Sequence, residues 1–305
     1  MPYVILSVAI VFALFLAVCF WAYYRTYLYG KDHPAPVPYA ESYGSECDAI
    51  PALIEEFMTL TFEEHNIKAY DGKNLFGRYY FKDKNAPLII MFHGYQGSLK
   101  RDFCGSLKPL YDMGYNILAI DQRSHGKSDG HSITFGIKER NDCLSWAKYA
   151  KENLSKDNPI FLMGVSMGAA TVLMASNMEL PKTVKGIIAD CPYSTPKDII
   201  KKECKNMGFN PKIVFPFIVC GGAIFGRLNI FKYDSLSSVK ECDLPILLIH
   251  GDNDMFVPHY MSQEIYKVCK NAKLEIFEGA AHGVCCLKDA ERYRNIIADF
   301  ILENK

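Results

Sequence analysis

Strand-like segments alternate with longer amphipathic stretches along most of the chain. The strand candidates lie at 58–69, 75–81, 87–92, 115–120, 159–163, 184–189, 245–249 and 273–277, and the later ones are short, continuous apolar runs. The amphipathic stretches lie at 99–113, 136–153, 167–179, 259–270 and 289–303. Continuous apolar runs are typical of parallel strands that are buried on both faces. The pattern therefore predicts an α/β fold with a mostly parallel, eight-stranded sheet and helices on both faces.

Two features modify this pattern. The first two strand candidates flank Asp71-Gly72, a typical hairpin turn, so we expect the sheet to begin antiparallel. The segment 195–240 separates two strands by roughly 45 residues, far more than an ordinary connection. Its centre is apolar but interrupted by three residues that disturb helices, Pro216, Gly221 and Gly222. We expect a helical lid over the carboxyl edge of the sheet, with a centre too short and broken to span a membrane.

The amino-terminal segment 3–24 carries no charge and is long enough to cross a bilayer as a helix. Trp21, Tyr23 and Tyr24 lie at one end of it, where interfacial aromatic residues are common. A cleaved signal peptide would have a basic start and a small-x-small cleavage site, and this segment has neither. The segment therefore favours an uncleaved, single-pass membrane anchor.

The chain should accordingly divide into three parts. We expect a membrane anchor at 1–26, a linker and an N-terminal helical segment at 27–57, and a catalytic domain at 58–305. The Pro-rich stretch 31–38 in the linker should be stiff and extended.

Charge and cysteine content bear on the compartment. Arg25 and Lys31 follow the apolar segment, which favours a cytoplasmic catalytic domain. The 11 cysteines have no repeating spacing, as expected for free thiols in a reducing compartment. The Cys285-Cys286 pair has no second cysteine pair or histidine cluster that would complete a zinc site, so we expect no metal. Lys plus Arg equals Asp plus Glu at 34 each, which gives no sign of a nucleic-acid partner. Basic pairs such as Lys100-Arg101 are interpreted as solvated helix faces.

A candidate nucleophile lies in Gly164-Val165-Ser166-Met167-Gly168, which matches the Gly-x-Ser-x-Gly nucleophile elbow. This motif places a serine on a sharp turn between a strand and a helix, and the flanking glycines let the two segments approach closely. A second copy, 126–130, is centred on Ser128. Only the copy at Ser166 follows an apolar strand and opens a helix. We therefore interpret Ser166 as the nucleophile and Ser128 as part of a turn.

A serine nucleophile needs a histidine base that is oriented by a carboxylate, and in this architecture the acid and then the base follow the serine along the chain. His282 lies in a Gly/Ala loop after the last predicted strand and is our candidate base. Asp254 follows the preceding strand and is our candidate acid, because Asp252 is better placed to cap the turn. Asp190, at the end of an earlier strand, is a third possible acid.

The remaining histidines after Ser166 are weaker candidates for the base. His250 ends a buried strand and should be packed and hydrogen-bonded, and His259 should open a helix.

Acyl transfer also needs N–H donors for the oxyanion. We expect one from the backbone of Met167, the residue after the nucleophile. The second should come from the loop after the third strand, where Tyr95 follows His93-Gly94.

Together these motifs resemble the α/β-hydrolase superfamily, in particular the serine aminopeptidase and prolyl-oligopeptidase-like group. The resemblance covers about residues 60–303 and also includes the loop 121–128 and the run 250–258; Ser124 stands where the family often has glycine. It implies the α/β-hydrolase fold and hydrolysis of an ester, thioester or amide without a cofactor.

The apolar lid and the anchor favour a serine hydrolase that cleaves an ester or thioester of a hydrophobic, lipid-like acyl substrate through an acyl-enzyme. The alternative is a serine peptidase of aminopeptidase or acylaminoacyl-peptidase type, for which we identify no subsite that would bind a peptide terminus. A non-catalytic binding or scaffold protein is the third possibility, and the intact set of nucleophile, acid, base and oxyanion loop argues against it.

Overall fold

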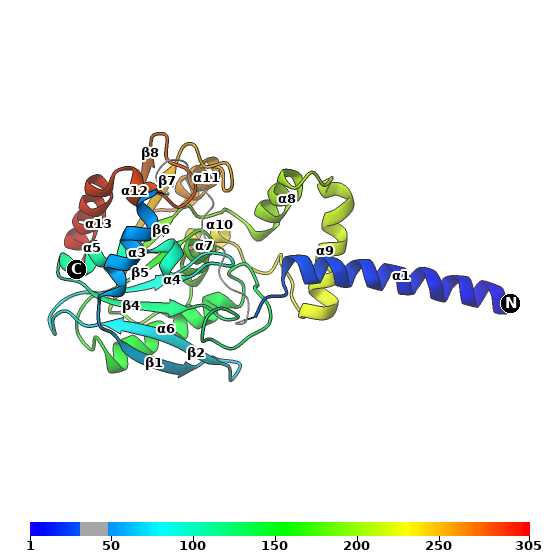
Figure 1. Cartoon of the computed structure of the whole chain (residues 1–305), viewed down its shortest axis with the longest axis horizontal. Helices are drawn as coiled ribbons and strands as arrows, with labels where there is room; N and C mark the ends of the chain where they lie inside the picture. Colours follow the sequence, from blue (N-terminus) through cyan, green and yellow to red (C-terminus); the bar gives the residue numbers. More distant parts are fainter. Residues whose placement is uncertain (31–47) are drawn as a thin grey trace.

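The computed structural model describes residues 1–30 and 48–305, so the predicted Pro-rich spacer at 31–38 lies outside the described residues. An eight-stranded sheet forms the centre of the molecule, with the strand order β1-β2-β4-β3-β5-β6-β7-β8 (Figure 1). The strands are β1 (Glu63–Lys68), β2 (Asn74–Tyr80), β3 (Leu88–Phe92), β4 (Asn116–Asp121), β5 (Ile160–Val165), β6 (Val184–Asp190), β7 (Ile246–Gly251) and β8 (Ala272–Phe277).

The pairing of the strands confirms the expected sheet. β1 pairs antiparallel with β2, β2 pairs antiparallel with β4, and the other neighbours are parallel. The hairpin between β1 and β2 turns at Gly72, whose φ of 83° suits glycine. The predicted start of the first strand at residue 58 is wrong, because the chain up to Met58 forms the helix α3 (Ile50–Met58). Ile50 and Phe57 are buried and lie two helical turns apart, so they face the domain from one side of α3.

Helices cover both faces of the sheet. One face packs against α6 (Glu139–Asn153), α7 (Met167–Ala175), α10 (Ser235–Lys240) and α11 (Tyr260–Val268). The other face packs against α3, α4 (Leu99–Asp102), α5 (Leu107–Asp112), α12 (Cys285–Lys288) and α13 (Ala290–Asn304). The strands β3 to β7 carry mainly aliphatic side chains that are buried on both sides, which is why they appear in the sequence as continuous apolar runs.

The segment between β6 and β7 forms the helices α8 (Pro196–Asn206), α9 (Pro211–Gly226) and α10. The expectation that Pro216 and the glycines break its apolar centre is wrong, because α9 is one helix of 16 residues. Pro216 lies only six residues into the helix, and the carbonyl it leaves unpaired belongs to Lys212, an exposed residue of the first turn.

The helix α1 (Pro2–Thr26) extends from the domain and is long and apolar enough to cross a membrane (Figure 1). Most of its side chains are exposed, but its carboxyl end is packed into the protein. Ala22, Tyr23 and Tyr27 join a cluster with the lid residues Phe215 and Ile218. Tyr23 is therefore buried against the lid, whereas Trp21 and Tyr24 remain exposed as expected for interfacial aromatic residues.

Candidate active site

Ser166 lies on a sharp turn between β5 and α7. Its φ of 55° and ψ of −115° place it outside the regions that a non-glycine residue normally adopts. The strain is held by the surrounding structure, since the Ser166 N–H donates to the Asp190 carbonyl at 2.8 Å at the end of the neighbouring strand β6. The turn thus fixes the serine at the carboxyl edge of the sheet.

The two glycines of this turn are required by close packing. A Cβ on Gly164 would overlap the backbone of Gly168, and a Cβ on Gly168 would overlap the Phe92 carbonyl at the end of β3. The first turn of α7 therefore approaches β3 and β5 more closely than any side chain would allow. This is the physical reason for the spacing of the pentapeptide.

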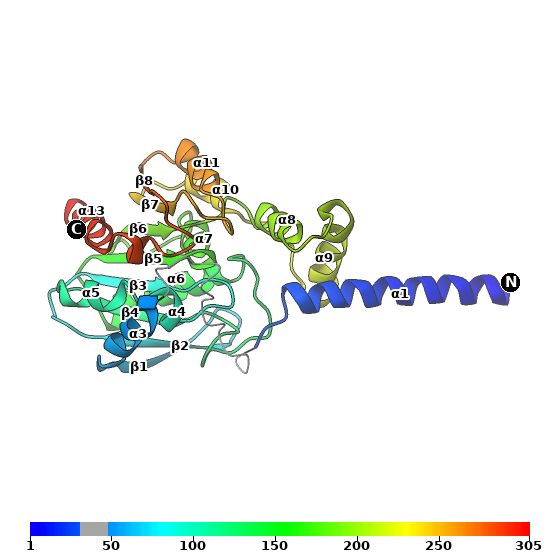
Figure 2. The ribbon, with the colours of Figure 1, turned by 45° about the horizontal axis from the view of Figure 1, so that its top comes forward.

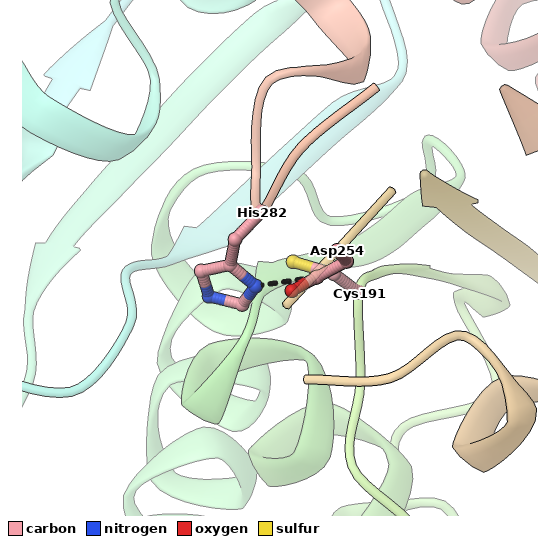
Figure 3. A group of neighbouring side chains, drawn as sticks. All are labelled: Cys191, Asp254 and His282. Carbon is pink, nitrogen blue, oxygen red and sulfur yellow. Dashed lines mark hydrogen bonds and ion pairs between the residues drawn. The ribbon is translucent and has the colours of Figure 1, made fainter. Parts of the chain in front are cut away.

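His282 and Asp254 meet at the same edge of the sheet. Figure 3 shows the His282 ring directed at the Asp254 carboxylate, and their Nδ1 and Oδ2 atoms are 2.6 Å apart. His282 comes from the loop after β8 and Asp254 from the loop after β7. The second carboxylate oxygen, Oδ1, accepts the N–H groups of Phe256 at 2.9 Å and Val257 at 2.7 Å. The carboxylate is thus held in place, and the hydrogen bond leaves Nε2 of His282 on the side away from Asp254.

The electrostatics of this pair favour its ionised form. Burial by itself would raise the pKa of Asp254, but the attraction of His282 and the hydrogen bonds from His250 and His282 hold it well below its ordinary value. Burial likewise opposes charge on His282, but the Asp254 carboxylate outweighs it and raises the pKa of His282 above 6.5. Asp254 is therefore ionised at neutral pH and stabilises the imidazolium that would form if His282 accepted a proton.

The carboxylates of the other two candidate acids, Asp190 and Asp252, are hydrogen-bonded to groups other than His282. Asp190 is buried, its Oδ2 accepts the Tyr293 hydroxyl at 2.9 Å, and burial raises the pKa of Asp190 to about 6. Asp252 is exposed, and its Oδ1 accepts the Gly279 N–H at 2.7 Å. In the described part of the chain, neither carboxylate is hydrogen-bonded to His282.

His250 is buried and hydrogen-bonded, as expected. Its Nδ1 lies 2.7 Å from the Ser262 hydroxyl, and its Nε2 lies 2.8 Å from the Val257 carbonyl and 3.3 Å from Asp254. His250 therefore helps to hold the loop that carries Asp254 in place. His259 precedes α11 as its N-cap residue.

Ser166 and His282 line the same small cavity, of about 20 Å³. Arg101, Val165 and Ile50 of α3 also line it. Both candidate catalytic side chains are only slightly exposed, 7% for Ser166 and 14% for the His282 side chain. The space is enough for about one water molecule, so an acyl group can enter only if neighbouring side chains move.

The backbone N–H groups of Tyr95 and Met167 have no acceptor within residues 1–30 and 48–305. Met167 occupies the first position of α7, where a helix leaves its N–H groups unpaired. The loop that carries Tyr95 is fixed by His93, which is buried with a pKa below its ordinary value because burial disfavours its charge. Its Nδ1 donates to the Gly94 carbonyl at 2.9 Å, and its Nε2 accepts the Gln122 N–H at 3.0 Å.

A partly buried ion pair also holds this loop in place. The guanidinium of Arg101 donates to the carbonyls of Tyr95 and Gln96, each at 3.2 Å, and pairs with Asp102 at 2.5 Å. Asp102 in turn accepts the Gly94 N–H at 2.6 Å. The interpretation of Lys100-Arg101 as a solvated helix face is therefore wrong for Arg101, whose side chain is only 14% exposed. An Arg-Asp pair directly after a Gly-rich loop was the signal that could have indicated this role.

Cys191 completes the neighbourhood of the acid and the base (Figure 3). Its sulfur, an Asp254 oxygen and a His282 nitrogen all lie within 4.8 Å of one another, a spacing that could hold a metal ion. Burial, followed by repulsion from Asp190 and Asp254, raises the pKa of Cys191 well above its ordinary value. A neutral thiol is a poor metal ligand, and Asp254 is already bonded to His282, so the donor set suits a hydrogen-bonded pair better than a metal.

The comparisons with known proteins agree with this architecture. A family model described as the alpha/beta hydrolase fold matches residues 87–212. The structure of the esterase Pf2001 from Pyrococcus furiosus superimposes with a TM-score of 0.69 at 23% identity, over 92% of this chain and 99% of that one. The chain has the α/β-hydrolase fold.

Two curated relatives show how far the likeness in sequence extends. The uncharacterized protein YqkD of Bacillus subtilis is 25% identical over 70% of each chain. The lysophosphatidylserine lipase ABHD12 of Rattus norvegicus is 25% identical over 67% of this chain and 52% of the lipase, so the match spans about half of that relative. The predicted fold and the class of serine hydrolase are confirmed, whereas the narrower likeness to the serine aminopeptidase and prolyl-oligopeptidase group stays a prediction.

Proposed function

We propose that the chain is a membrane-anchored serine hydrolase that cleaves an ester or thioester of a hydrophobic acyl substrate. Ser166 is the nucleophile, His282 the general base and Asp254 the acid that orients it. The observation that carries the proposal is the 2.6 Å hydrogen bond between His282 and Asp254, beside a strained serine in one cavity. The amides of Tyr95 and Met167 form the oxyanion hole.

In the proposed mechanism, Nε2 of His282 takes the hydroxyl proton as Oγ of Ser166 attacks the acyl carbonyl. The two amides stabilise the charge on the carbonyl oxygen. His282 then returns the proton to the leaving alcohol or thiol, and an acyl-serine remains. Water repeats the sequence in the second half: His282 accepts its proton, the hydroxide attacks the acyl carbon, and the proton goes back to Ser166 as the carboxylic acid leaves.

The preference for a lipid-like acyl substrate has two supports. Several relatives are lysophosphatidylserine lipases, and such a lipid carries one acyl ester. The apolar lid helix α9 and the helix α1 also lie next to the site through one cluster of side chains. We further propose that α1 anchors the chain with the domain on the cytoplasmic side, which Arg25 after the span favours. Eight of the ten described cysteines are buried, and no disulfide joins any two of these ten, which fits a reducing compartment.

A fluorophosphonate probe applied to the full-length protein tests the chemistry. We expect wild type to be labelled and Ser166→Ala to be unlabelled, with a fall in kcat of about 10⁶. Lack of label on wild type, or equal label on Ser166→Ala, contradicts the proposal. Turnover of p-nitrophenyl esters of increasing chain length, measured against aminoacyl anilides, then separates an esterase from a peptidase.

A further inference from the structure

The lid helix α9 packs across the second half of α1 (Figures 1 and 2). The rings of Phe15 and Phe217 lie 5.9 Å apart, and those of Phe20 and Phe225 lie 5.2 Å apart. The two backbones also come close, because a Cβ on Gly221 would overlap the carbonyl of Cys19. The two apolar helices thus form one unit at the end of the molecule that carries the amino terminus.

The length of α1 determines the depth of α9 in a bilayer that α1 crosses. A hydrocarbon core of ~30 Å requires about 20 apolar residues in a helix. The 13 residues of α1 before Phe15, whose ring contacts Phe217 of α9, measure only about 20 Å at the helical rise. The remaining thickness must come from the part of α1 that contacts α9. If α1 crosses a membrane, α9 therefore lies inside it.

The orientation of α9 relative to α1 agrees with this depth in the bilayer. Figures 1 and 2 show α9 running across α1 rather than alongside it, so α9 lies in the plane of the membrane when α1 stands upright. Gly221 meets α1 at Cys19 and Gly226 meets it at Tyr23. These contacts lie about 3 to 9 Å inward of Arg25 along the axis of α1. Helices that lie in a membrane interface are buried to a similar depth, about 5–10 Å.

The exposed surface of α9 has the composition that this position requires. The helix carries no acidic residue, and its outward side chains include Ile213, 62% exposed, and Ile224, 49% exposed. Exposed basic residues flank it, Lys212 in its first turn and Arg227 after its last residue. Such residues can extend to the headgroups while the apolar side chains stay in hydrocarbon.

We propose that α9 is embedded in the leaflet on the domain side and that the site takes its acyl substrate laterally from that leaflet. The cluster that contains Phe215 and Ile218 of α9 continues to Met167 and Tyr95, beside Ser166. The Tyr95 hydroxyl also donates to the Thr26 carbonyl at the end of α1, at 3.0 Å. An acyl chain leaving the leaflet would therefore meet apolar side chains up to the nucleophile. This inference rests on the proposed anchoring by α1.

Tryptophan quenching in vesicles of brominated phosphatidylcholine tests the position of α9 without depending on activity. Full-length Trp21→Phe/Ile224→Trp should lose more than half of its added fluorescence in brominated vesicles relative to unbrominated ones. The matched control is Trp21→Phe/Leu302→Trp, since Leu302 is 62% exposed on α13 and should be unaffected. Equal quenching in the two variants, with both bound to vesicles, overturns the embedded lid and leaves the anchor standing. Protein that stays in the supernatant overturns both.

Substrate presentation tests the lateral route. We expect Ile213→Asn/Ile224→Asn to lower turnover of a long-chain acyl ester held in vesicles at least tenfold and to leave turnover of a soluble short-chain ester unchanged. Leu302→Asn should alter neither. An equal fall for both substrates indicates damage to the site rather than to delivery and overturns the route, as does unchanged turnover in vesicles.

Discussion

The chain contains two Gly-x-Ser-x-Gly pentapeptides, and the structure uses them in opposite ways. In 164–168 the serine has the unusual backbone, with φ of 55°, and the glycines are needed because neighbouring backbone approaches them. In 126–130 the glycines have the unusual backbone, with φ of 52° for Gly126 and 135° for Gly130, and Ser128 does not. The turn at 164–168 presents the Ser166 hydroxyl at the edge of the sheet, whereas the loop at 126–130 encloses the Ser128 hydroxyl.

The surroundings of the two hydroxyls differ in the same way. Ser128 is fully buried, and its Oγ donates to the Asp121 carbonyl at 2.5 Å and accepts the Phe76 N–H at 2.9 Å. Its hydrogen bonds tie the loop after β4 to β2. Ser166 lines a cavity together with His282. A pentapeptide therefore indicates a nucleophile only when its hydroxyl is left available and a base lies beside it.

The largest expected difference in kcat is between substitutions of two carboxylates, Asp254 near Ser166 and Asp121 near Ser128. Asp254→Asn should lower kcat by about 10⁴, because the amide can no longer hold His282 in the correct tautomer or stabilise its charge. Asp121→Asn is the control near the other serine: its carboxylate pairs with Arg78 at 2.8 Å, so we expect a loss of stability with kcat nearly unchanged. Steady-state kinetics and thermal melts measure both. A kcat near that of wild type in Asp254→Asn would move the acid to Asp190 or Asp252.

A smaller effect on rate is expected at Arg101. Removing its guanidinium loosens the loop that presents the Tyr95 amide, so Arg101→Ala should lower kcat by about tenfold to a hundredfold, less than loss of a donor itself. KM should change little, because the amide acts on charge that develops in the transition state. The adjacent Lys100 is exposed, and Lys100→Ala should behave as wild type. A rise in KM alone would place Arg101 in substrate binding instead.

On the acidic side of the pH profile, kcat/KM should change by about tenfold per pH unit. The base must be neutral, and the pKa of His282 is raised, so kcat/KM should fall with decreasing pH along a limb centred above 6.5. Asp254→Asn should move this limb to lower pH. His125, near Ser128, should add no limb, because burial holds its pKa well below 6.5 and it stays neutral. A limb that stays in place in Asp254→Asn contradicts the assignment of the base.

The same pair predicts how stability depends on pH. The raised pKa of His282 contributes stability that is complete below 6.5 and is lost as pH rises through the folded-state value. The lowered pKa of Asp254 contributes stability that is present above 3.8 and is lost as pH falls. Urea unfolding of Asp254→Asn should therefore show its largest deficit, relative to wild type, between these limits.

The sequence was sufficient for the sheet and for the spacing of the candidate site, because buried parallel strands are continuous apolar runs and each candidate residue follows one of them. It was not sufficient where tertiary contacts decide. The stretch at 58–62 is apolar enough for a strand, but in the structure it forms the last residue of α3 and the turn that follows this helix. Pro216 is tolerated near the start of α9, and the glycines that suggested a break are contact points with α1. Two of the partners of Arg101 are backbone carbonyls, which leave no pattern in the sequence, so only the adjacent Asp102 could have indicated that Arg101 is not solvated.

The smallest effect, and the sharpest test of the comparison, is expected from Ser128→Ala. The substitution leaves the buried Phe76 N–H without its acceptor, which should lower the free energy of unfolding by about 1–3 kcal/mol in urea titrations. Ser194→Ala is a matched control, because the buried Ser194 hydroxyl has no partner among the described residues and its loss should change stability little. Fluorophosphonate labelling and kcat should match wild type in both variants. Loss of label in Ser128→Ala with the fold intact would mean that the second pentapeptide takes part in catalysis, and the two serines would no longer be separable by their surroundings.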